Sequence, residues 1–104
     1  MLTFLKELLG LGPKADYKAL KSQGAIIVDV RTPEEFRADH LKGAVNIPLD
    51  RVRREVASFQ KKKKPVILYC RSGNRSGMAK SILRAAGIEA YNAGSLGAMR
   101  RALR

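Results

Sequence analysis

The chain has 104 residues, of which 45% are hydrophobic and 29% charged, and its formal net charge is +12. These values are typical of one folded domain with a single core, and they exclude a disordered chain. No apolar run approaches the roughly 20 residues that span a bilayer. A single cysteine and a single histidine exclude an internal disulfide and a structural zinc site, so we expect no metal and no cofactor.

Residues 2–9 have apolar side chains at helical spacing, interrupted by charge, and are predicted to form a short amphipathic helix that ends at Gly10. The segment has no basic start and no small-residue cleavage site, so we expect no signal peptide and take the cytoplasm as the default location. We assign residues 1–13 to an N-terminal extension and residues 14–104 to the domain. The extension is expected to pack on the domain; a docking helix, a dimer contact or a weak membrane-surface anchor are alternatives.

The domain is predicted to begin with a helix over residues 15–22. A continuous apolar, β-branched run follows at residues 25–30, AIIVDV, the pattern of a strand buried on both faces. Three signals then predict a helix start: Thr32 as N-cap, Pro33 at the first helical position and Glu35 completing a capping box.

The middle of the chain is predicted to hold a short strand over residues 44–47 and a helix with Asp50 as its N-cap. The apolar residues of this helix recur at helical spacing, and they are Leu49, Val52, Val56 and Phe59. The four lysines at 61–64 are interpreted as a solvated connection. They precede a second buried strand over residues 66–70, VILYC.

The last third is predicted to contain a helix over residues 76–86, a strand over 88–91 and a C-terminal helix. The apolar side of the first helix is formed by Met78, Ala79, Ile82, Leu83 and Ala86, and that of the last by Leu96, Met99 and Leu103. Strands that alternate with helices in this way predict an α/β fold, a parallel sheet with helices on both faces.

A single segment, Cys70 to Gly77, carries the chemistry. It joins the carboxyl end of a buried strand to the start of a helix, which is where ligands bind in open α/β sheets. Helix N-terminal amides attract anions, and two glycines let the loop curl so that its amides point inward. With Arg71 and Arg75 beside it, Cys70 is expected to have a lowered pKa and to react as a thiolate. No second base is apparent, since His40 is interpreted as structural.

Four segments together resemble the rhodanese homology domain: AIIVDVR, then PEEF, then HLKGAVNIP, then VILYCRSGNRS. The resemblance covers about residues 16–104. It implies a rhodanese-like α/β fold with a six-residue active-site loop from Cys70 to Arg75. It also implies a sulfurtransferase that takes sulfane sulfur from thiosulfate or a low-molecular persulfide onto Cys70 and passes it to a thiophilic acceptor.

The same resemblance suggests roles for individual residues. Cys70 would be the catalytic residue, and the substrate would be bound by Arg71, Ser72, Gly73, Asn74, Arg75 and Ser76. Asp29 and Arg31 of the first strand would brace the site rather than react. The partners implied are a small anionic sulfur donor and a thiol or cyanide acceptor, with thioredoxin or an acidic acceptor protein as candidates.

Two other functions stay open at this point. Cysteine phosphatases and arsenate reductases also place a cysteine loop at a helix start, but they clamp the oxyanion with an arginine six positions after the cysteine. Here that position is Ser76, and Arg75 comes one residue early. The other alternative is an idle rhodanese fold that binds a partner through its basic half, since residues 51–104 carry fourteen Lys or Arg and two Glu. With no tryptophan and six other aromatic residues, we do not expect nucleic acid as a partner.

Overall fold

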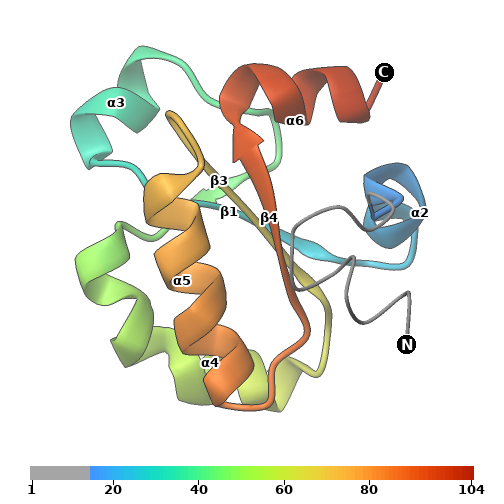
Figure 1. Cartoon of the computed structure of the whole chain (residues 1–104), viewed down its shortest axis with the longest axis vertical. Helices are drawn as coiled ribbons and strands as arrows, with labels where there is room; N and C mark the ends of the chain where they lie inside the picture. Colours follow the sequence, from blue (N-terminus) through green and yellow to red (C-terminus); the bar gives the residue numbers. More distant parts are fainter. Residues whose placement is uncertain (1–14) are drawn as a thin grey trace, which may run out of the picture.

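The computed structural model describes residues 15–104, and its centre is a parallel sheet of four strands in the order β2-β1-β3-β4 (Figure 1). The strands are β1 (Ile26–Asp29), β2 (Val45–Asn46), β3 (Val66–Cys70) and β4 (Ala90–Ser95). The prediction of an α/β fold with a parallel sheet is confirmed. The helix predicted over residues 2–9, and with it the whole of the proposed N-terminal extension, lies outside the described residues.

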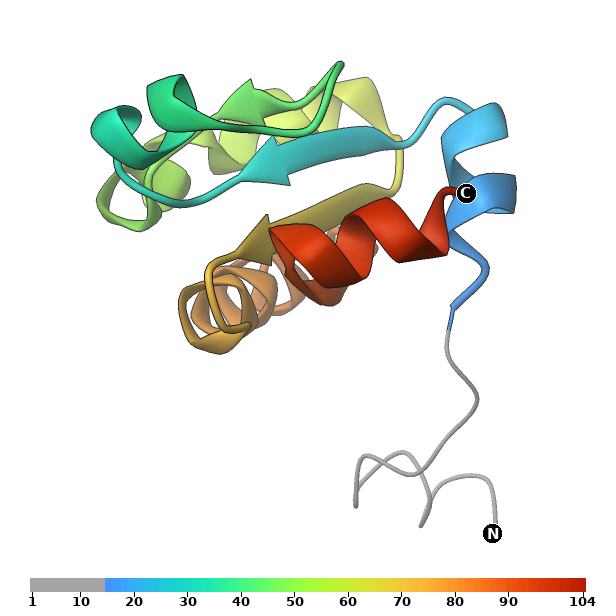
Figure 2. The same ribbon diagram turned by 90° about the horizontal axis from the view of Figure 1, so that it is seen from above.

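Helices cover both faces of the sheet, as predicted. In chain order they are α2 (Tyr17–Ser22), α3 (Pro33–Ala38), the 3₁₀ helix η1 (Leu49–Glu55), α4 (Val56–Lys62), α5 (Asn74–Ala85) and α6 (Leu96–Ala102). One apolar cluster joins the sheet to η1, α4 and α5, and a second joins it to α2 and α6. Figure 1 shows α4 and α5 on one side of the strands and α2 and α6 on the other, and Figure 2 gives the view from above.

The two central strands place alternate side chains in the two clusters because successive residues of a strand point to opposite faces. Leu68 and Cys70 belong to the cluster under α5, whereas Ile67 and Tyr69 belong to the cluster under α6. All five side chains of β3 are buried. The continuous apolar run in the sequence therefore reports burial on both faces, and it directs the Cys70 side chain toward α5.

The capping box at the start of α3 is confirmed: the Thr32 hydroxyl accepts from the Glu35 backbone, and the Glu35 carboxylate accepts from the Thr32 backbone. The prediction of Asp50 as an N-cap is wrong. The N-cap lies two residues earlier, because the 3₁₀ helix η1 begins at Leu49, with Pro48 as its N-cap and no side-chain cap. The Leu49 amide donates to the carbonyl of Val30 (3.1 Å), the residue that directly follows β1, so the backbone itself anchors this first turn.

The lysine run is not the connection that we predicted. Helix α4 continues through Lys62, and the chain turns at Lys63, whose φ is +54°. Phe59 is the buried residue of α4, and the Lys63 amide donates to the Phe59 carbonyl oxygen (3.2 Å). Lysine is a good helix former, so an exposed lysine run prolongs the helix until a left-handed residue ends it.

Two boundaries in the last third also differ from the prediction. Helix α5 starts at Asn74, two residues early, and Met78 is 60% exposed whereas Ala79 and Leu83 are buried. The buried face of α5 is therefore narrower than the predicted apolar side, which included Met78. Strand β4 begins and ends later than residues 88–91, at Ala90 and Ser95. Its residues 92–94 are Asn, Ala and Gly, which have low strand propensity, and the strand pairs with β3 through an irregular register.

Within residues 15–104, no helix has both the length and the apolar character that crossing a membrane requires.

Candidate active site

Cys70 is the last residue of β3, and the turn at residues 71–73 leads directly into α5. Its side chain is fully buried. The Sγ atom accepts hydrogen bonds from the Gly73 amide (3.0 Å), the Ser76 amide (3.5 Å) and the Ser76 hydroxyl (3.3 Å). Three donors from the loop and the first turn of the helix therefore converge on one sulfur atom.

These donors favour the thiolate. Burial by itself would raise the pKa of the Cys70 thiol, but the Ser76 hydroxyl and the backbone amides of Ser76, Gly73 and Ser72 more than offset it, so the pKa lies below its usual value. Hydrogen bonds to a charged group stabilise that charge. The groups that hold the negative charge are thus loop amides and one hydroxyl.

Gly73 gives the loop its shape. Its φ of +97° is a conformation that side chains disfavour, and a Cβ atom here would lie 3.4 Å from the Gly94 Cα atom. This backbone conformation turns the Gly73 amide toward the sulfur (3.0 Å), and a side chain at this position would be in van der Waals contact with β4.

Asn92 of β4 holds the loop from the other side, and sequence reasoning missed it. Its Nδ2 atom donates to the Gly73 carbonyl oxygen (2.9 Å), and its Oδ1 atom accepts from the Gly94 amide (2.9 Å) and the Ser76 hydroxyl (2.7 Å). Nothing in the sequence marks Asn92, since it meets the loop only through the pairing of β4 with β3.

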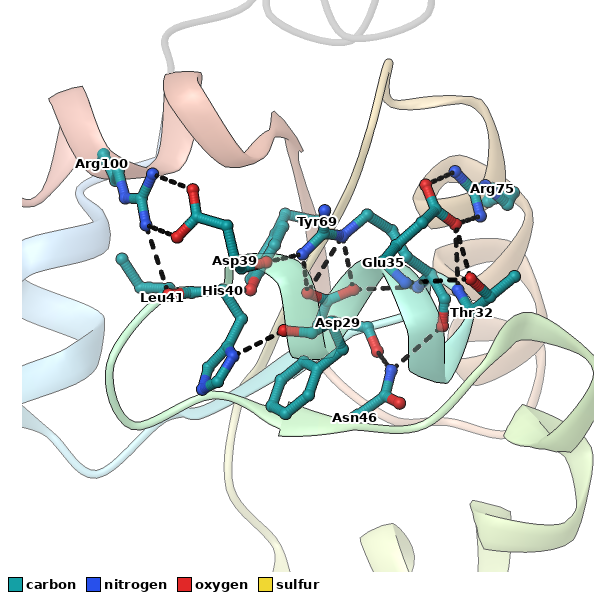
Figure 3. Close-up of polar contacts among 12 residues, drawn as sticks. Asp29, Thr32, Glu35, Asp39, His40, Leu41, Asn46, Tyr69, Arg75 and Arg100 are labelled. Atoms are coloured by element: carbon teal, nitrogen blue, oxygen red, sulfur yellow. Dashed lines mark hydrogen bonds and ion pairs between the residues drawn. The ribbon is translucent and has the colours of Figure 1, made fainter.

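The two loop arginines have different surroundings. Arg71 is exposed, and within residues 15–104 no carboxylate pairs with it. Arg75 binds the Glu35 carboxylate through two hydrogen bonds of 2.7 and 3.0 Å (Figure 3). Much of the Arg75 charge is therefore neutralised by α3, and Glu35 is a second neighbour of the loop that the sequence did not identify. Ser72 and Asn74 are exposed at the mouth of the loop.

Asp29 and Arg31, predicted to brace the site, form a buried pair at the carboxyl end of β1. The Arg31 Nη2 atom lies 2.7 Å from Asp29 Oδ2 and also donates to the Asp39 carbonyl oxygen (2.6 Å). Asn46 donates to the backbone carbonyls of both residues (3.0 Å each). The pair thus ties β1 to the segment after α3 and to β2, as Figure 3 shows, and it makes no hydrogen bond to the cysteine loop.

Tyr69 and His40 complete this edge of the sheet. The Tyr69 hydroxyl accepts from the Leu41 amide (3.0 Å), and burial raises its pKa to about 12. His40 is exposed; its ring stacks on Phe36 at 3.7 Å and its Nδ1 atom donates to the Phe36 carbonyl oxygen (2.7 Å). His40 therefore closes the end of α3 and makes no hydrogen bond to Cys70.

A hollow of about 270 Å³ lies far from the cysteine, at the amino end of the sheet. The end of α4 and the turn before β4 form it, with Phe59, Lys63 and Glu89 among its walls. Within the described residues, no group of three or more His, Cys, Asp or Glu side chains is placed to hold a metal ion.

Comparison with known proteins agrees with this architecture. The model of the rhodanese-like domain family matches residues 13–96. The thiosulfate sulfurtransferase PspE of Escherichia coli (strain K12) is 41% identical over 71 residues, which cover 66% of this chain and 68% of that protein. The uncharacterized protein YqhL of Bacillus subtilis (strain 168) is 44% identical over 69 residues, which cover 65% of this chain and 54% of that protein.

Solved structures show the same likeness. A rhodanese with anions from E. coli superimposes with a TM-score of 0.66 at 39% identity, covering 72% of this chain and 91% of that one. A rhodanese-like domain protein from Staphylococcus aureus gives a TM-score of 0.68 at 36% identity, covering 79% and 80%. The family match, these relatives and the cysteine loop at the start of α5 agree, and the chain belongs to the rhodanese-like domain family.

Proposed function

We propose that the protein is a sulfurtransferase that carries sulfane sulfur as a persulfide on Cys70. The observation that carries this proposal is the Cys70 sulfur, which is buried at the end of β3 and accepts hydrogen bonds from the Gly73 amide and from both the amide and hydroxyl of Ser76. The likeness to a thiosulfate sulfurtransferase supports sulfur transfer as the class of reaction.

The proposed reaction has two steps. In loading, the Cys70 thiolate attacks the outer sulfur of thiosulfate. A bond forms between Sγ and that sulfur, the sulfur–sulfur bond of thiosulfate breaks, and its electron pair leaves with sulfite. In discharge, an acceptor such as cyanide or a thiolate attacks the outer persulfide sulfur. The bond to Sγ breaks and its electron pair stays on Sγ, so the thiolate is restored.

The loop amides can stabilise both the Cys70 thiolate and the Cys70 persulfide. A sulfur atom added to Cys70 carries a negative charge, and amides at the start of α5 are positioned to receive it. Arg71 is the exposed cation beside the loop, so we assign it the attraction of anionic donors such as thiosulfate.

The basic charge of the chain bears on the acceptor. All of the excess positive charge lies in residues 51–104, which include the loop, α5 and α6. A surface of this sign speeds encounters with negatively charged partners, so we propose that a protein acceptor presents its thiol within an acidic surface.

The surroundings of Ser76 and Arg75 favour sulfur over phosphate as the transferred group. An oxyanion clamp needs an arginine fork that faces into the loop. Here the Arg75 fork binds Glu35, and the position where the clamp would lie is taken by Ser76, whose hydroxyl lies 3.3 Å from Sγ. A cradle filled in this way suits one sulfur atom on the cysteine better than a tetrahedral phosphate.

The test is sulfur transfer from thiosulfate to cyanide, and from thiosulfate to a thiol, by wild type and Cys70→Ser. The hydroxyl is nearly isosteric with the thiol, so the variant should keep its far-ultraviolet circular dichroism and its unfolding midpoint while losing transfer. Transfer by Cys70→Ser close to that of wild type would overturn the proposal. A wild type that transfers sulfur to neither acceptor would favour a module that only binds a partner.

A further inference from the structure

The Ser76 hydroxyl lies between two acceptors. Its Oγ atom is 3.3 Å from Cys70 Sγ and 2.7 Å from Asn92 Oδ1. A hydroxyl has one proton to donate, and the amide oxygen of Asn92 can only accept. The Ser76 hydroxyl can therefore donate to only one of the two atoms at a time. A negative charge on Sγ favours the hydrogen bond to Sγ, and its absence favours the hydrogen bond to Asn92 Oδ1.

Asn92 is held in place independently of this choice. Its Nδ2 atom donates to the Gly73 carbonyl and its Oδ1 atom also accepts from the Gly94 amide. A Cβ atom on Gly77 would lie 3.3 Å from Asn92 Nδ2, so the amide group packs closely against the first turn of α5. The oxygen that Asn92 presents to Ser76 is thus a fixed acceptor.

We propose that Ser76 is a movable hydrogen-bond donor, and that Asn92 is the positioning residue whose Oδ1 atom accepts the Ser76 hydrogen bond whenever Sγ carries no charge. The proposal rests on the proposed function. In the thiolate, the hydroxyl donates to Sγ. In the persulfide the charge lies on the outer sulfur and Sγ is bonded to it, so the hydroxyl donates to Asn92.

This arrangement assists one step more than the other. In discharge the acceptor attacks the outer sulfur, the bond from that sulfur to Sγ breaks, and the electron pair moves onto Sγ. The Ser76 hydroxyl then turns back and stabilises the new charge. In loading the same hydrogen bond stabilises the thiolate before it attacks, which lowers its nucleophilicity. A better-stabilised thiolate leaves faster and attacks no faster, so Ser76 favours discharge.

Single-turnover kinetics of Ser76→Ala test this asymmetry. Loading is followed by intact mass after mixing with thiosulfate, and discharge by thiocyanate released when preloaded protein meets cyanide. Both are measured well above the thiol pKa of each protein, where thiolate fractions are equal. We expect discharge to slow about tenfold, the effect of losing one charge-assisted hydrogen bond, while loading stays unchanged or becomes slightly faster.

Ser81→Ala is the matched control. Ser81 lies on the same helix, is exposed, and donates only to the Gly77 carbonyl oxygen (3.2 Å). Both of its rates should equal those of wild type.

The part played by Asn92 is tested on the thiol, without sulfur transfer. Asn92→Asp and Asn92→Leu both lose the donor to Gly73, but only the aspartate keeps an acceptor for the Ser76 proton. The inflection of iodoacetamide alkylation against pH should be higher in Asn92→Asp than in Asn92→Leu. This difference should shrink when Ser76→Ala is added to both, because coupling between two residues vanishes when one is removed.

The outcomes separate the two proposals. A wild type that forms no persulfide with any donor would overturn the proposed function and this inference with it. A wild type that does form one, with loading and discharge slowed equally in Ser76→Ala, would overturn only the inference. If the difference in alkylation inflection between Asn92→Asp and Asn92→Leu is the same with and without the Ser76 hydroxyl, Asn92 does not act through Ser76.

Discussion

Glu35 and Arg75 lie 40 positions apart in the chain and join through two parallel hydrogen bonds, Nη1 to Oε1 at 2.7 Å and Nη2 to Oε2 at 3.0 Å. The Glu35 carboxylate also accepts from the Thr32 amide (3.1 Å) and so closes the capping box of α3. One carboxylate therefore fixes the start of α3 and fastens it to the first turn of α5, beside the cysteine loop.

Glu35 should make the stability of the protein depend on pH. The Arg75 guanidinium, followed by the Thr32 amide, lowers the pKa of Glu35 from 4.5 to about 2. Because the pKa of the folded state is the lower one, the stabilisation is present above about pH 4.5 and is lost as the pH falls toward 2. Urea unfolding across this window should show wild type losing more free energy of unfolding than Glu35→Gln.

Glu34→Gln is the control for this prediction. The pair of Glu34 with Arg37 is exposed and 3.6 Å long, so this variant should lose as much free energy of unfolding across the window as wild type. Equal losses in wild type and Glu35→Gln would contradict the assignment.

The two loop arginines should differ in their effect on donor use. Arg75 is paired with Glu35, so Arg71 supplies more of the uncompensated charge at the loop. We expect Arg71→Ala to lower kcat/KM for thiosulfate more than Arg75→Ala does. With an uncharged sulfane-sulfur donor, Arg71→Ala should change little. Its thiosulfate rate should also fall less steeply with added salt, because salt screens exposed charges. Equal losses for charged and uncharged donors would mean that Arg71 shapes the loop instead.

The buried pair of Asp29 and Arg31 should matter for stability. Asp29 is fully buried and the Arg31 side chain is 9% exposed, so Asp29→Asn leaves a buried positive charge without a counterion. Breaking a buried pair in this way costs about 3 kcal/mol or more of the free energy of unfolding. Arg37→Ala, which breaks the exposed pair with Glu34, should cost about 1 kcal/mol or less. Similar unfolding midpoints in urea for the two variants would contradict the inference that the pair stabilises this edge of the sheet.

Gly73 and Gly43 form a matched pair for testing the loop. Both have positive φ angles, +97° and +89°, but a Cβ atom at Gly73 would lie 3.4 Å from the Gly94 backbone, whereas at Gly43 nothing lies within 4 Å. Both alanine variants pay the same backbone strain. The Gly73 amide donates to the Cys70 sulfur (3.0 Å), so a backbone that relaxes at Gly73→Ala should raise the pKa of Cys70 and reduce sulfur transfer. Gly43→Ala should lose only some stability. Alkylation against pH and urea unfolding measure the two effects. A normal Cys70 pKa in Gly73→Ala would show that its amide is not a main donor to the sulfur.

The sequence predicted correctly those features that depend on neighbouring residues alone, such as a buried strand and a helix cap. The run VILYC predicted β3 with its full length, and Thr32 with Glu35 predicted a capping box that forms. These signals succeed because burial on both faces and a helix cap need only neighbouring residues. Prediction failed where a hydrogen bond to a distant part of the backbone sets the start of a helix. Pro48 rather than Asp50 is the N-cap of η1, because the Leu49 amide donates to the Val30 carbonyl that follows β1.

The candidate site divides in the same way. The placement of Cys70 at a helix start follows from one continuous segment of sequence. The partners of that segment do not, because Asn92 reaches the loop through strand pairing and Glu35 reaches it from α3. An asparagine among small residues, and a glutamate already explained by a capping box, give no sign of these contacts before the chain folds.

The central claim is that Cys70 carries the transferred sulfur, and the intact mass of the protein tests it most directly. Wild type and Cys70→Ser are incubated with thiosulfate, freed of small molecules, weighed, and weighed again after cyanide is added. We predict that wild type gains the mass of one sulfur atom, that cyanide removes it, and that Cys70→Ser gains nothing. A wild type with no adduct from thiosulfate or from any persulfide donor, or an adduct of the same mass on Cys70→Ser, would contradict the account.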